Sequence, residues 1–105
     1  MYRLKIFYIT NESQQAAENL VKALLKKYLI GCANIFPIQS FYWDSGSIVH
    51  EGECVVIAKT LPQVAIRLEE EIKAIHPYKT PCIVQIDGSC NKDYFEWLSN
   101  ELKAE

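Results

Sequence analysis

The chain has 105 residues, half of them hydrophobic, a formal net charge of −2 and a pI of about 5.7. That size supports one hydrophobic core, so we expect a single domain over residues 1–105. Two of the eleven basic residues are arginine and no basic run occurs, which argues against nucleic acid or an anionic membrane as a partner. No signal peptide or bilayer-length apolar run is evident, so we expect a cytoplasmic protein.

The first third of the sequence predicts a strand followed by a helix. Residues 4–9 are rich in β-favouring types and predict a strand. We expect Asn11 to cap the following helix, with Gln14 reaching back as in a capping box. Gly31 is expected to end this helix in a left-handed conformation. The apolar residues that recur at helical spacing are Ala17, Leu20, Val21, Leu24 and Tyr28.

A long hairpin follows, with predicted strands over residues 34–42 and 48–59 around Asp44-Ser45-Gly46. Pro37 lies inside the first arm and indicates an edge strand or a bulge. Arms of roughly ten residues exceed the usual five or six, and each would span about 33 Å, more than two ordinary helices cover.

The exposed part of this hairpin predicts self-association, because unpaired backbone and apolar area invite another chain. We expect a homo-oligomer with Phe41, Tyr42 and Trp43 at its interface. The alternative is that the terminal helix folds back over the overhang within one subunit. Strand geometry alone does not fix the number of subunits.

The last third predicts helix, strand and helix. Pro62 occupies a first-turn position that tolerates proline, residues 82–86 predict a buried strand, and Asn91 is placed to cap the final helix. The order β-α-β-β-α-β with an extra C-terminal helix predicts an α+β fold. It is a ferredoxin-like sandwich, in which an antiparallel sheet carries both main helices on one face.

Residues 76–81, His-Pro-Tyr-Lys-Thr-Pro, join the second helix to the last strand. Two prolines stiffen this loop and hold His76, Tyr78 and Lys79 in set positions, so the loop is either a ligand site or a helix stop. His50, Glu51 and Glu53 form a second polar cluster, which we expect on a solvent-facing strand edge.

The four cysteines show no C-x-x-C and no zinc-type pairing, so we expect free thiols. Cys32, Cys54 and Cys82 lie in or beside apolar runs and are expected to be small core residues. Cys90 lies in a polar stretch and is expected to be exposed.

Several segments occur together, in order, along the chain. They are Gly31-Cys32-Ala33-Asn34-Ile35 with Pro37, Ser40-Phe41-Tyr42-Trp43, Gly46, Ile57-Ala58-Lys59-Thr60, residues 76–81 and Tyr94-Phe95-Glu96-Trp97-Leu98. Through these segments the chain resembles the CutA family of divalent-cation tolerance proteins over nearly its whole length. The resemblance implies a trimer with three sheets edge to edge and a role in tolerance of copper and other divalent cations.

The resemblance also implies a reduced metal site. Family members suited to copper carry a cysteine at the end of the first strand and two histidines before the proline, where this chain has Ile9, Ile75 and His76. Lys79 stands where the family has an acidic residue. Copper sites need several imidazole or thiolate ligands. We therefore expect His76 to be the candidate ligand of one chain, with weak binding of Cu²⁺ or another divalent cation. The alternative is that trimerisation brings further ligands from another subunit.

The alternative function is a small-molecule sensor. His76 at a helix end, together with Lys59 and Lys79, would suit an anion, and trimers of the PII type share the fold and bind anionic effectors between subunits. Trp43 and Tyr78 would wall such a cleft.

Two other classes that share the topology are excluded. Residues 53–57 lack the aromatics of an RNA-recognition module, and residues 10–13 lack the glycine and arginine of an acylphosphatase-like loop. No nucleophile–base pair is visible at short spacing, so we expect no enzyme.

Overall fold

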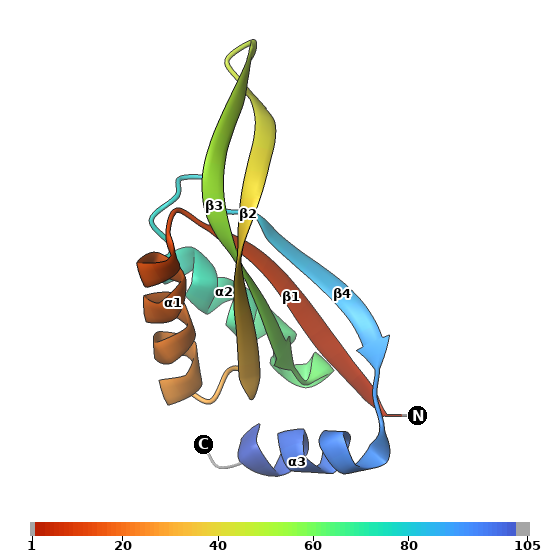
Figure 1. Cartoon of the computed structure of the whole chain (residues 1–105). Helices are drawn as coiled ribbons and strands as arrows, with labels where there is room; N and C mark the ends of the chain where they lie inside the picture. Colours follow the sequence, from red (N-terminus) through yellow and green to blue (C-terminus); the bar gives the residue numbers. More distant parts are fainter. Residues whose placement is uncertain (1, 103–105) are drawn as a thin grey trace.

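The computed structural model describes residues 2–102, so residue 1 and residues 103–105 of the predicted domain lie outside the described part. Four strands and three α-helices occur in that part (Figure 1). They are β1 (Arg3–Asn11), α1 (Gln14–Lys26), β2 (Cys32–Asp44), β3 (Ser47–Thr60), a short 3₁₀ turn η1 (Pro62–Val64), α2 (Ala65–Ile75), β4 (Ile83–Ser89) and α3 (Lys92–Leu102).

The strands form one antiparallel sheet in the order β2-β3-β1-β4. This confirms the predicted α+β fold with a ferredoxin-like strand order. Pro37 lies on β2, which is an edge strand of the sheet. An edge strand tolerates proline, because only one of its sides pairs with another strand. Within residues 2–102, no helix is long and apolar enough to cross a bilayer.

Helices α1 and α2 cover one face of the sheet (Figure 1). Residues of β1 and β3 that pair across the sheet, such as Phe7 with Ala58 and Ile9 with Val56, point into this layer and are fully buried. The alternate residues of each strand point to the other face, because side chains alternate along a strand. That second face carries no helix over its centre, and we call it the open face.

The hairpin is longer than predicted, with 13 residues in β2 and 14 in β3. Ser45 and Gly46 both have positive φ, 52° and 84°, as a tight two-residue hairpin turn requires. β3 pairs with β1 only as far as Cys54, so residues 47–53 pair with β2 alone. The hairpin extends the molecule to 45 Å against 24 and 21 Å in the other directions.

Helix α3 lies at the opposite end of the molecule from the hairpin tip (Figure 1). Its Leu98 is fully buried and approaches Gly31, while Phe95 packs against Tyr2 with ring centroids 5.6 Å apart. The terminal helix therefore does not cover the overhang, and the alternative that it folds back over the hairpin is wrong for this chain.

The predicted ends of α1 are wrong in position. The cap is Ser13, whose Oγ accepts the Ala16 amide at 3.1 Å, whereas Asn11 is a buried residue of β1 that donates to two backbone carbonyls. At the other end, Tyr28 takes the left-handed conformation with φ 57°. Gly31 is needed for a different reason, because a Cβ there would overlap Leu98 Cδ1.

The cysteine predictions hold only in part. All four are free thiols, and Cys54 is a core residue as expected. Cys82 is exposed rather than buried, and so are Val84 and Ile86, because they lie on the face of the sheet without helices; the prediction of a buried strand over residues 82–86 is wrong. Cys90 is half-buried rather than exposed, because it packs against the core; its amide donates to the Tyr2 carbonyl at 2.9 Å.

Candidate functional site

Three hydrogen bonds fix the loop after α2, and two of them join it to the sheet. His76 ends α2 in an extended conformation, and its Nε2–H donates to the Thr10 carbonyl at 2.8 Å. Its Nδ1 accepts the Tyr78 amide at 3.1 Å. The Tyr78 hydroxyl then donates to Glu53 Oε2 at 2.6 Å. The stiff loop predicted from its prolines therefore docks where β1 and β3 stop pairing.

Both nitrogens of the His76 ring are engaged, and the residue is 8% exposed. Because Nε2 donates its hydrogen to a carbonyl and Nδ1 accepts a hydrogen bond from an amide N–H, the ring is the neutral Nε2–H tautomer. A metal ion at Nδ1 would have to displace the Tyr78 amide. No group of three His, Cys, Asp or Glu side chains suited to a metal occurs among residues 2–102.

The open face contains a hollow of about 590 Å³ at the base of the hairpin, which we call the sheet hollow. Strand alternation and the Tyr78–Glu53 bond place side chains from β1, β2, β3 and the 76–82 loop around it. Its lining includes Tyr8, Thr10, Ile38, Tyr42, Glu53 and Tyr78.

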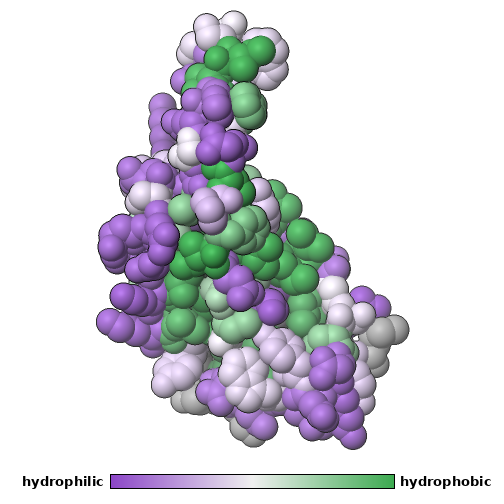
Figure 2. Space-filling model, in the orientation of Figure 1, coloured by the Kyte–Doolittle hydropathy of each residue, from purple (hydrophilic) through white to green (hydrophobic). Residues whose placement is uncertain are grey.

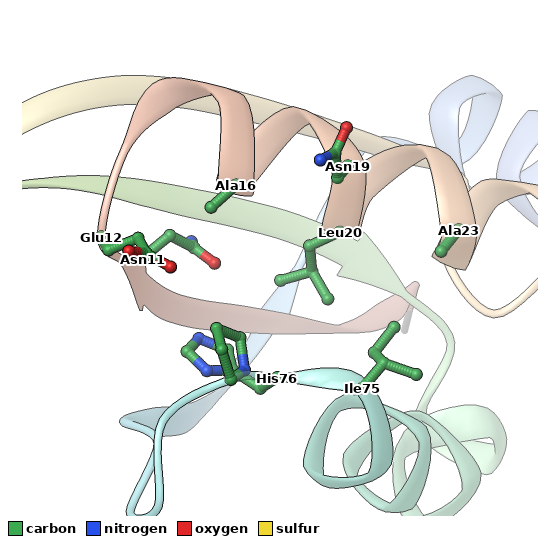
Figure 3. Close-up of a pocket in the computed structure, with 9 residues that line it drawn as sticks. Asn11, Glu12, Ala16, Asn19, Leu20, Ala23, Ile75 and His76 are labelled. Atoms are coloured by element: carbon green, nitrogen blue, oxygen red, sulfur yellow. The ribbon is translucent and has the colours of Figure 1, made fainter.

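A second hollow, of about 410 Å³, lies between α1 and the end of α2 (Figure 3). Ala16, Leu20 and Ile75 give it an apolar wall. The amide nitrogen of Asn11 and the ring of His76 border it, but both are hydrogen-bonded to backbone. Glu12 and Asn19 supply the remaining polar side chains of its lining.

The four residues predicted to form an anion cleft are not brought together within one chain. Lys59 lies at the far end of β3, where its Nζ sits 5.3 Å from the centre of the Tyr94 ring. Six residues separate it from Glu53, the partner of Tyr78, which corresponds to about 20 Å along the strand. Trp43 pairs with Ile48 at the hairpin tip. Lys79 is exposed in the loop.

Glu53 is the residue that sequence reasoning misplaced. We expected a solvent-facing strand edge. Glu53 lies one residue beyond the part of β3 that pairs with β1, but Tyr78 covers it and it is only 9% exposed. Its neighbours Tyr8 and Thr10 were not singled out at all. The alternation of these two residues with the buried Phe7 and Ile9 was the available signal.

The comparisons with known proteins agree with this architecture. The family model described as CutA1 divalent ion tolerance protein matches residues 5–101. The chain belongs to the CutA1 family. A curated member, the divalent-cation tolerance protein CutA of Pyrococcus horikoshii, is 42% identical over 99 residues, covering 93% of this chain and 97% of the relative. CutA of Archaeoglobus fulgidus is 39% identical and covers 91% and 95%.

Solved CutA structures share the fold closely. The Archaeoglobus fulgidus protein superimposes with a TM-score of 0.91 at 38% identity, covering 94% of this chain and 98% of that one. CutA of Synechococcus elongatus gives a TM-score of 0.93 at 27% identity, covering 97% and 92%. The CutA1 resemblance seen in the sequence is therefore confirmed for both family and fold.

Proposed function

We propose that this CutA1-family chain acts as a cytoplasmic, non-enzymatic homotrimer in the response to divalent cations. Family membership supports the link to divalent cations. The four free thiols suit a reducing compartment. The observation that carries the assembly is the uncovered hairpin, where Phe41, Trp43 and Ile48 are each about two-thirds exposed or more.

The open face supports the same proposal. Phe36, Val84 and Ile86 are exposed there, and Figure 2 shows a hydrophobic region over the middle of the sheet. A continuous apolar patch on a soluble chain marks an interaction surface. Residues 47–53 add unpaired backbone on one side of β3. Association with further copies would bury both features at once.

Sedimentation velocity at several protein concentrations tests the assembly. The expected species is a trimer, and Trp43→Asp is expected to weaken it because the indole would no longer be buried between subunits. Ile66→Asp is the matched control, since Ile66 is 76% exposed on α2, away from the hairpin. A monomer or dimer at micromolar concentration would contradict the trimer.

We further propose that direct binding of Cu²⁺ or another divalent cation is weak. The support is that His76 has no free ring nitrogen and that Ile9 and Ile75 supply no metal-binding atoms. Titration calorimetry with Cu²⁺ and Zn²⁺ should compare wild type, His76→Ala and His50→Ala. Equal heats in wild type and His76→Ala would remove His76 as a ligand, and submicromolar binding lost only in His76→Ala would contradict weak binding.

The sensor of anionic effectors remains the second candidate. It requires a neighbouring subunit to bring Lys59 close to Tyr78, because one chain keeps them apart. Stabilisation of the trimer by a nucleoside phosphate, but not by metal ions, would favour it over the metal response.

A further inference from the structure

The hollow between α1 and the end of α2, which we call the helix groove, lies in the helix layer of the molecule (Figure 3). That layer covers the face of the sheet opposite to the open face (Figure 1). The groove therefore lies apart from the open face and the hairpin tip, the two surfaces that the proposed association would bury. Association through those surfaces leaves the groove open to solvent.

The groove is bordered by a buried amide oxygen that has no donor within the chain. Asn11 is 2% exposed, and its Nδ2 donates to the carbonyls of Ile9 and Cys54 at 3.2 and 3.4 Å. These two bonds fix the orientation of the carboxamide and leave Oδ1 as an acceptor. No hydrogen bond to Oδ1 occurs within residues 2–102, where every fully buried side-chain oxygen has a partner. Oδ1 is therefore open to the groove, where it can accept a hydrogen bond from a ligand.

The same end of the groove is negatively charged. Glu12 carries an exposed carboxylate there, and no ion pair to it occurs in the part of the chain that the structure describes. The described lining contains no lysine or arginine, and His76 is neutral with both ring nitrogens engaged. Burial first, then the hydrogen bond to Glu53 and the charges of three glutamates, Glu12 among them, raise the pKa of Tyr78 in the adjacent loop.

The rest of the groove is an apolar track along α1. Ala16, Leu20 and Ala23 recur every three or four residues, so they lie on one side of the helix. They extend over two turns, or about 10 Å. Ile75, at the end of α2, lines the opposite side and is 41% exposed. An unbranched hydrocarbon chain suits a track of this length, because it would remove these apolar groups from water.

Anions and divalent metal ions suit the groove less well. The first turn of α1 would attract an anion, but the Ser13 side chain and carbonyl already accept the amides of Ala16 and Ala17, and Glu12 repels negative charge. The adjacent end of α2 presents carbonyl groups, which favour a cation. Ca²⁺ and Mg²⁺ demand about six oxygen ligands, whereas this groove presents one carboxylate and the amide oxygen of Asn11 beside an apolar track.

We propose that the helix groove binds a primary ammonium ion carried on a short, unbranched hydrocarbon chain. The ammonium group donates to Asn11 Oδ1 and lies beside the Glu12 carboxylate, while the hydrocarbon chain lies along α1 and against Ile75. The volume of about 410 Å³ is in the range of small-ligand sites.

Calorimetric titration of n-hexylamine into the intact assembly tests this site, with 1-hexanol and hexanoate as the neutral and anionic counterparts. We expect saturable binding of hexylamine, at least about tenfold weaker binding of hexanol, and weaker binding still of hexanoate. Glu12→Gln removes the charge and should weaken hexylamine binding about three- to fivefold, as for an exposed ion pair. Glu70→Gln is the matched control, because Glu70 is exposed on α2 and does not line the groove.

A second pair of variants tests the location of the bound chain. Ala23→Phe fills the apolar track and should abolish hexylamine binding, whereas Ala74→Phe places the same ring on an exposed part of α2 outside the groove. Several outcomes would overturn the proposal: no saturable hexylamine binding, equal binding of hexanol, binding that survives both Glu12→Gln and Ala23→Phe, or Glu12-dependent binding of Mn²⁺ without binding of hexylamine. Sedimentation of the same samples reports the assembly separately, so a negative result would leave the proposed trimer standing.

Discussion

The two histidines of this chain allow a matched test of whether His76 is primarily a structural residue. His76→Ala removes two hydrogen bonds that fix the 76–82 loop, and it leaves the Thr10 carbonyl and the Tyr78 amide without their partners. His50 is exposed, bonds Gln39 and stacks on Phe41 with ring centroids 4.1 Å apart. The same substitution at the two sites therefore separates a buried anchor from a surface contact.

The expected magnitudes follow from these contacts. Each lost hydrogen bond costs about 1 kcal/mol net, and the unsatisfied groups and lost packing add a similar amount again. His76→Ala should therefore lower the free energy of unfolding by roughly 2–4 kcal/mol. For His50→Ala we expect less than about 1 kcal/mol, as is usual for a surface position.

Urea or guanidinium unfolding measures both changes, provided that protein concentration is held constant, because assembly contributes to apparent stability. The Tyr78→Phe variant adds a check on the loop, since it removes the bond to Glu53 while His76 stays in place. If His76→Ala costs no more stability than His50→Ala, the view of His76 as a buried structural anchor fails.

Three further predictions concern local structure. Gly31→Ala should destabilise by about 1–3 kcal/mol through overlap with Leu98, and should cost less in a Leu98→Ala background; equal costs in a double-mutant cycle would contradict the close approach. Ser13→Ala should cost about 1 kcal/mol in thermal unfolding through loss of the α1 cap, and no loss would mean that another group caps the helix. In a titration of phenolate absorbance, the difference between the curves of wild type and Tyr42→Phe should show that Tyr42 ionises near pH 12 instead of 10. Because the folded state raises this pKa, its stabilising effect is complete below pH 10 and fades as the pH rises from 10 to 12, and Glu51→Gln should bring the ionisation back toward 10.

Parts of the site were predictable and parts were not. The sequence placed His76, Tyr78 and Lys79 in a rigid loop, because two prolines restrict the backbone locally whatever the rest of the chain does. It did not reveal that the loop docks on Thr10 and Glu53, since those contacts span 66 and 25 residues. Contacts at such separations depend on how the elements pack in three dimensions, which no local pattern encodes.

The amino-acid pattern alone determined the elements, their order and the hairpin overhang. Periodicity, glycines and prolines act over a few residues, and a strand's length can be counted directly from its pattern. Cap positions were missed because Asn11 and Ser13 both suit a cap, and only pairing with β3 drew Asn11 into the sheet. Tertiary packing likewise assigned Gly31 to a close approach, because Leu98 arrives there from 67 residues away. It also gave Glu53 its buried position, because the loop after α2 lies across it and Tyr78 donates to its carboxylate.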